Sequence, residues 1–84
     1  MALIKKKIVN LLSALLDATD SNLLANLQAQ VYQTVEMVNM TREKFLKKCV
    51  DVYHIIRTVN DYCEEPTEIN KTGVRLLIQR IKDC

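Results

Sequence analysis

Apolar residues between positions 45 and 63 recur at alternating spacings of four and three. They are Phe45, Cys49, Val52, Ile56, Val59 and Cys63. This alternation places all of them on one side of an α-helix and is typical of helices that pack at a shallow angle. The β-branched residues of the chain follow the same helical period and not the period of two that a half-buried strand needs. The pattern predicts a helix over residues 42–63, opened by Thr41, and favours a helical bundle.

Turn residues are scarce in this chain, which has one Gly and one Pro among 84 residues. An all-β domain needs many turns and therefore many such residues, so that class is excluded. Glycine-rich loops that hold phosphate groups, and the glycine-flanked turn of a serine nucleophile, are excluded for the same reason.

Three further segments have helical spacing of their apolar residues. The segment 3–16 carries Ile4, Ile8, Leu11 and Leu15; 22–38 carries Leu24, Leu27, Val31, Val35 and Val38; 66–83 carries Ile69, Val74, Leu77, Ile78 and Ile81. Asp20 or Ser21 is expected to cap the second helix, and Pro66 is expected to be the first residue of the last. The predicted fold is all-α: one domain over residues 1–84, a compact antiparallel four-helix bundle with helices at about 3–16, 22–38, 42–63 and 66–83.

Gly73 lies inside the last predicted helix, where glycine costs about 1 kcal/mol relative to alanine. It is expected to mark close packing against the preceding helix, or a kink after which Thr72 caps the second half.

The first helix carries more apolar surface than one bundle core is expected to cover. Leu3, Val9, Leu12 and Leu16 widen its apolar side beyond half of the circumference. A domain this small also gains little net stability from its core alone. We therefore expect Leu3, Leu12 and Leu16 to contact a second copy of the chain or a partner helix.

The second helix lacks charge between Ser21 and Val35 and carries amides in its place. A solvated helix face normally bears Glu and Lys. Gln28, Gln30 and Gln33 therefore indicate a face that is desolvated inside the bundle or against another chain, or one that is exposed and simply uncharged. The first functional hypothesis is a non-catalytic interaction or assembly module that forms a homo-oligomer or a complex with another helical protein.

Basic residues suggest a second hypothesis, a small nucleic-acid-associated accessory factor. The candidate contacts are Lys5, Lys6, Lys7, Arg42, Lys44, Lys47 and Lys48. The formal net charge is only +2, and no aromatic residues alternate with the basic ones to stack on bases. The sequence thus favours the protein-binding hypothesis over this one.

Two partial resemblances bear on the second hypothesis. Residues 52–84 resemble part of the helical N-terminal domain of transcription elongation factors, through Thr72, Val74, Ile78, Gln79, Ile81 and Lys82. Arg75 stands where that family has a Gly, and the family's final helix is missing. Segments 11–15 and 68–71 resemble the first and last helices of the small four-helix cofactor of the coronavirus RNA polymerase, with gaps between the matches. Both resemblances imply an accessory subunit that docks onto nucleic-acid machinery.

Catalysis, a cofactor and a bound metal are not expected. His54 is the only histidine, with Asp51 as a possible orienting partner on the same helix. A zinc site needs three or four converging ligands, and His54 with Cys49 or Asp51 supplies two.

The three cysteines indicate a reducing, intracellular location, cytoplasmic or nuclear. Cys49, Cys63 and Cys84 have no metal-ligand spacing. On one helix Cys49 and Cys63 lie roughly 21 Å apart, too far for a disulfide, whereas Cys84 could approach Cys49. No apolar run reaches the ~18 residues of a membrane span, and polar residues interrupt the run that follows Lys5–Lys7, so neither an anchor nor a signal peptide is expected. The chain is expected to be either a whole protein or a piece of a longer one.

Overall fold

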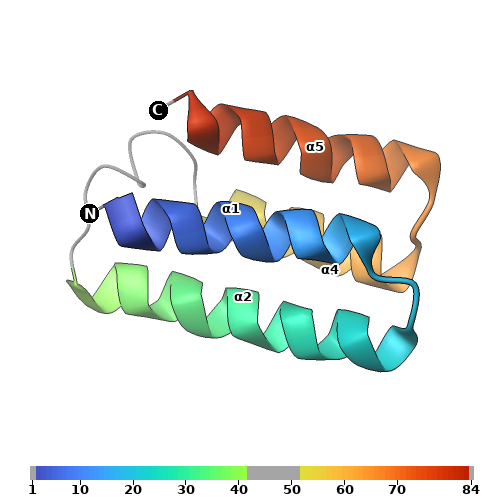
Figure 1. The fold of residues 1–84 in the computed structure, drawn as a ribbon, viewed down its shortest axis with the longest axis horizontal. Coiled ribbons are helices and arrows are strands. Elements are labelled where there is room, and N and C mark those ends of the chain that lie inside the picture. The colour runs from blue at the N-terminus through green and yellow to red at the C-terminus, as the bar shows by residue number, and fades with distance from the viewer. Residues whose placement is uncertain (1, 42–51, 84) are drawn as a thin grey trace.

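The computed structural model describes residues 2–41 and 52–83. These residues form four helices and no strand: α1 (Ala2–Asp17), α2 (Ser21–Thr41), α4 (Val52–Glu64) and α5 (Glu68–Lys82) (Figure 1). The predicted all-α four-helix bundle is confirmed. The first half of the predicted helix 42–63 lies outside the described residues.

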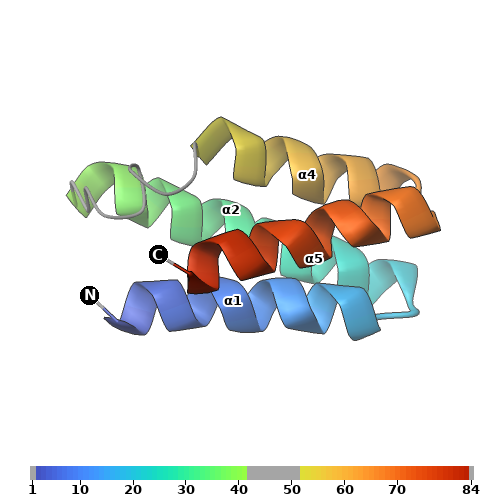
Figure 2. The same ribbon diagram turned by 90° about the horizontal axis from the view of Figure 1, so that it is seen from above.

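The four helices alternate in direction and run close to the long axis of the molecule, as two perpendicular views show (Figures 1 and 2). Each helix packs mainly against two neighbours: α1 and α4 each lie between α2 and α5. The α1–α2 turn and the α4–α5 turn lie at one end of the bundle, and the beginning of α1 and the end of α5 lie at the other (Figure 1). The molecule measures 32 × 21 × 19 Å.

Buried apolar side chains from all four helices form one cluster. Its members are Ile8, Leu11, Leu12, Leu15, Leu27, Val31, Val35, Ile55, Val59, Tyr62, Val74, Leu77, Ile78 and Ile81. Thr34 is the one buried polar side chain among the described residues, and its hydroxyl donates to the Gln30 carbonyl oxygen at 2.8 Å. This bond satisfies the hydroxyl inside α2, so Thr34 is buried without an unpaired polar group.

The prediction that Leu12 lies on a spare apolar edge of α1 is wrong. Leu12 is fully buried, with 0% of its surface exposed, and Leu16 is half-buried against the core. The physical reason is that α1 has two neighbouring helices, so its apolar arc must face both α2 and α5. The side chain of Leu3 lies outside the described part of the chain.

The core-facing sides of α4 and α5 also differ from the sequence prediction. Ile69, assigned to the apolar stripe of the last helix, is 83% exposed. On α4, Ile55 and Tyr62 are buried although they are not part of the predicted stripe, while Val52, Ile56 and Cys63 pack at the edge of the core. The stripe on α4 is therefore rotated toward Ile55 and Tyr62 relative to the a/d pattern.

Helix α5 begins with a threonine cap and not with Pro66. Thr67 has extended backbone angles, and its side-chain oxygen accepts a hydrogen bond from the Asn70 backbone N–H at 3.3 Å. Asp20 plays the corresponding part for α2, because its carboxylate accepts from the Asn22 N–H at 3.2 Å, as expected.

Gly73 lies within an unbroken helix. The Thr72 hydroxyl donates to the Glu68 carbonyl oxygen at 2.9 Å, a bond inside the same helix, so Thr72 does not start a second one. A Cβ atom at Gly73 would lie 3.9 Å from Cγ2 of Thr58, an ordinary contact distance. The glycine therefore faces α4, with room left for a methyl group.

Candidate interaction surfaces

Five exposed side chains of α2 make a surface without charge, here called the uncharged face: Leu23, Asn26, Gln30, Gln33 and Met37. Their spacing of three, four, three and four places them on one side of the helix. Leu23 is 48% exposed and Met37 51%, and the Gln30 amide donates to Oδ1 of Asn26 at 2.6 Å. Of the amides predicted to form an interface, Gln30 and Gln33 lie here; Leu23 and Met37 were not predicted, although their helical spacing could have indicated them.

Gln28 does not lie on the uncharged face but between α2 and α4. Its amide nitrogen donates to Oδ1 of Asn60 at 2.6 Å and to the Tyr32 hydroxyl oxygen at 3.1 Å, and the Tyr32 hydroxyl also donates to Asn60. Gln28 thus lies inside the bundle, between two of its helices. This is the first of the alternatives that the sequence left open for the amides of this helix. These bonds fix the pairing of α2 with α4, because each partly buried polar group needs the others.

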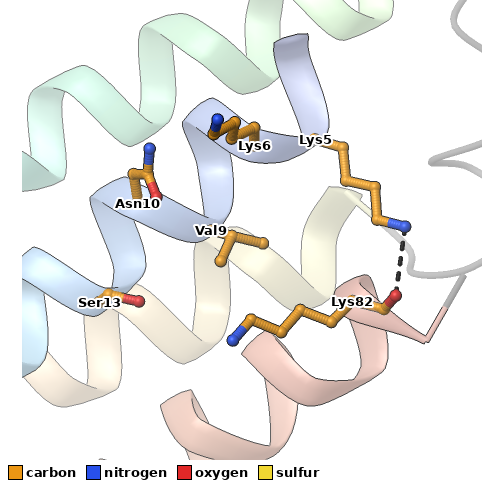
Figure 3. A pocket seen from close by; sticks show the side chains of 6 residues that line it. All are labelled: Lys5, Lys6, Val9, Asn10, Ser13 and Lys82. Atoms are coloured by element: carbon orange, nitrogen blue, oxygen red, sulfur yellow. Dashed lines mark hydrogen bonds between the residues drawn. The ribbon is translucent and has the colours of Figure 1, made fainter. Parts of the chain in front are cut away.

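A shallow groove of about 450 Å³ between α1 and α5 gathers three lysines (Figure 3). It is lined by Lys5, Lys6, Val9, Asn10, Ser13 and Lys82. Lys5 donates from Nζ to the Lys82 carbonyl oxygen at 3.2 Å, which satisfies an otherwise unpaired carbonyl at the end of α5. Lys82 was not among the predicted nucleic-acid contacts and joins the groove only through the fold.

Of the other predicted basic contacts, only Lys7 lies within the described residues. Lys7 is exposed on α1 but is not part of the lining. Arg42, Lys44, Lys47 and Lys48 lie outside the described residues.

A second groove, of about 240 Å³, lies between α4 and α5 and is lined by His54, Thr58, Gly73, Leu76, Leu77 and Arg80. Leu76 is 66% exposed. No carboxylate belongs to this lining, so among the described residues His54 has no orienting acid in the groove. Asp51, the expected partner of His54, lies outside the described residues.

Acidic residues gather where α4 meets α5. Asp61, Glu64, Glu65 and Asn70 line a hollow there. The Asn70 amide donates to the carbonyl oxygens of Asp61 at 3.1 Å and Glu65 at 2.7 Å. Asn70 thus ties the start of α5 to the end of α4 at the turn end of the bundle, where these carboxylates lie.

Within residues 2–41 and 52–83, no three His, Cys, Asp or Glu side chains converge as a metal site would need. Cys63 is a free thiol, and burial raises its pKa above the ordinary value of 9.0. A raised pKa keeps this thiol protonated and therefore weakly nucleophilic near neutral pH.

None of the helices within the described ranges has the length and apolar character to cross a membrane.

The geometry defines a helical bundle that exposes the uncharged face of α2, a groove between α1 and α5, and a groove between α4 and α5. Comparisons of the chain with protein-family models, curated proteins and solved structures give no match. The two sequence resemblances receive no support from these comparisons.

Proposed function

We propose that this protein is a non-catalytic interaction module that binds a helix of a partner protein through the uncharged face of α2. The observation that carries the proposal is the exposure of about half of Leu23 and of Met37 at the two ends of a row of amides. Interfaces are depleted in charge at their centres and enriched in methionine, and the uncharged face has this character, with the exposed Glu36 beside it near Met37.

The spacing of the uncharged face fits a helical ligand. Leu23 and Met37 are fourteen residues apart on α2, or roughly 21 Å along the helix axis. A partner helix of about four turns spans that distance and can place apolar side chains on both ends. The amides between them then need partners on the ligand, because an amide buried without a hydrogen bond costs about 1–3 kcal/mol. The expected ligand is therefore an amphipathic helix with Asn, Gln, Ser or Thr at the centre of its binding side.

A pair of substitutions on α2 tests this proposal. Met37→Glu adds a charge to the uncharged face, and Ala25→Glu adds the same charge to an exposed position about 120° away around the same helix. In affinity capture from cells followed by quantitative mass spectrometry, we expect a helical protein to bind the native chain and the Ala25→Glu variant but not Met37→Glu. Circular dichroism should show the same helix content in all three. Equal capture of every protein by both variants would contradict the proposal.

The proposal includes the intracellular location, cytoplasmic or nuclear, that the cysteines indicate, and the free Cys63 thiol agrees with it.

The nucleic-acid hypothesis remains the second candidate, because the fold adds Lys82 to Lys5 and Lys6 around one groove. Asn10 and Ser13 supply neutral hydrogen-bonding groups beside the lysines, and none of the described residues that line the groove carries a carboxylate. Such a groove suits the phosphates of a nucleic-acid backbone.

Salt-dependent retention on heparin tests the second candidate. If the groove binds phosphates, Lys6→Glu should elute at lower salt than Arg57→Glu, which changes the net charge equally but lies on α4. Elution of both variants at the same salt concentration would rule out the groove as the site.

A further inference from the structure

Two matched rows of side chains flank the groove between α4 and α5. The row on the α4 side consists of His54, Thr58, Asp61 and Glu65. The row on the α5 side consists of Ile69, Gly73, Leu76 and Arg80. Both rows step four, three and four, so the α5 row lies along one side of its helix. His54, Thr58 and Asp61 lie along one side of α4, and Glu65 directly follows its end. Thr58 and Gly73 face one another at the middle, where Cγ2 of Thr58 lies 3.9 Å from a Cβ built on Gly73.

The α5 row exposes two large apolar side chains on either side of its centre. Ile69 is 83% exposed and Leu76 is 66% exposed, and Gly73 between them presents no side chain. A partner surface can therefore approach closest at the middle of the groove, with apolar side chains to either side.

Charge is distributed unequally along this face. Asp61, Glu64 and Glu65 lie at the turn end. Arg80 lies at the other end with His54, and the carboxylate of Asp83 there accepts a hydrogen bond from Gln79. Among the described residues, this face is acidic at one end, carries Arg80 at the other and exposes apolar side chains in between.

We propose that a second copy of this chain binds the α4–α5 face in an antiparallel arrangement. Turning one copy end for end places Ile69 of each copy on Leu76 of the other and Arg80 on Glu65 of the other. The same patch then serves on both copies, as a two-fold dimer requires. A parallel arrangement places acidic end on acidic end and is disfavoured by repulsion. This inference goes beyond the proposed function, because it concerns a different face and a different partner.

Sedimentation velocity over a range of protein concentrations tests the apolar part of the interface. We expect the native chain to change from monomer to dimer as its concentration rises, and Leu76→Glu to remain monomeric. Met37→Glu, the matched control on α2, should dimerise like the native chain. A native chain that stays monomeric at millimolar concentration, or a dimer that persists in Leu76→Glu, would overturn the inference.

A charge exchange tests the antiparallel direction. Arg80→Glu and Glu65→Arg should each weaken the dimer about tenfold, because each change replaces two symmetry-related attractive pairs by repulsive ones. The double variant should recover most of the native affinity, since the opposite charges again meet. Failure of the double variant to recover, with helix content unchanged, would refute this arrangement. Because Met37→Glu reports on partner capture and Leu76→Glu on self-association, either proposal can fail while the other holds.

Discussion

Leu12 and Leu76 have identical side chains but opposite exposure to solvent in the bundle. Leu12 of α1 is completely buried, whereas Leu76 of α5 is 66% exposed. The sequence shows both residues in amphipathic helices, but which side of a helix becomes interior depends on where its neighbours lie. Both α1 and α5 pack against two helices. Leu12 lies on the side of α1 that faces the core cluster, whereas Leu76 lies on the side of α5 that faces away from it.

Truncation of these leucines should separate core from surface. Leu12→Ala removes buried methyl groups and leaves a cavity, so we expect the free energy of unfolding to fall by about 2–5 kcal/mol. Leu76→Ala should change it by about 0.5 kcal/mol or less at concentrations where the chain is monomeric. Urea denaturation followed by circular dichroism measures both. Equal losses of stability in the two variants would mean that Leu12 is not the core residue described here.

The Cys63 thiol gives the fold a dependence on alkaline pH. Its pKa is raised in the folded chain by burial, so above the ordinary thiol pKa of 9.0 the unfolded chain loses this proton more readily than the folded one. Folding is then favoured less as pH rises through that value. In a background of Cys49→Ser and Cys84→Ser, the unfolding free energy should decline more steeply between about pH 8 and pH 10 with Cys63 present than in Cys63→Ala.

Reaction with a thiol reagent provides an independent measurement for Cys63. In the same background the folded chain should react more slowly than the urea-unfolded chain, since fewer thiolates are present and access is restricted. Equal rates in the two states would contradict the burial of this thiol.

At the scale of the helices, the periodicity of the sequence predicted the starts of α1 and α2 and the end of α4 to within one residue. The structure differs more at the end of α2, which is Thr41 and not Val38, and at the start of α5, which is Glu68 and not Pro66. Pro66 and Thr67 are adjacent and both favour a helix start, the first through its fixed φ and the second through its side-chain oxygen. The structure uses Thr67 as the cap, which leaves Pro66 in the turn. Which of two adjacent start signals the helix uses depends on where the preceding helix ends.

The threonine cap should contribute measurably to α5. Thr67→Ala removes the acceptor of the Asn70 N–H, and we expect the unfolding free energy to fall by about 1 kcal/mol. Thr67→Ser keeps the oxygen and should retain nearly all of the stability. Thermal or urea denaturation of the three chains, at one concentration, distinguishes the cap from a general effect of replacing Thr67. An alanine variant as stable as the serine variant would show that Asn70, through its amide bonds to α4, determines the start of α5.

At the scale of the whole molecule, the periodicity of the sequence could not predict the contacts between different helices. Gln28 meets Asn60 because α2 is adjacent to α4, and Lys82 meets Lys5 because α5 returns to the beginning of α1. Each pair is distant in sequence, so only the order of the helices around the bundle brings it together. The amide pattern therefore indicated unusual residues on α2 but could not divide them between the bundle and the surface.

The same order of helices separates charge between the two ends of the bundle, which makes ionic strength a test of the whole arrangement. Asp61, Glu64 and Glu65 gather at the turn end, while Arg80 and Lys82 lie at the other together with Asp83. Between about 0.02 M and 0.3 M sodium chloride the screening length falls from roughly 20 Å to 6 Å, so attraction between exposed ends of two copies weakens. We expect the native dimer to dissociate more readily as salt is added. The Leu76→Glu monomer should keep nearly constant unfolding free energy, because no charged side chain is buried among the described residues and the Arg75–Glu68 ion pair, at 3.9 Å, is exposed. A dimer that tightens steadily over this range would mean that apolar contact alone holds it and that the charged ends do not meet.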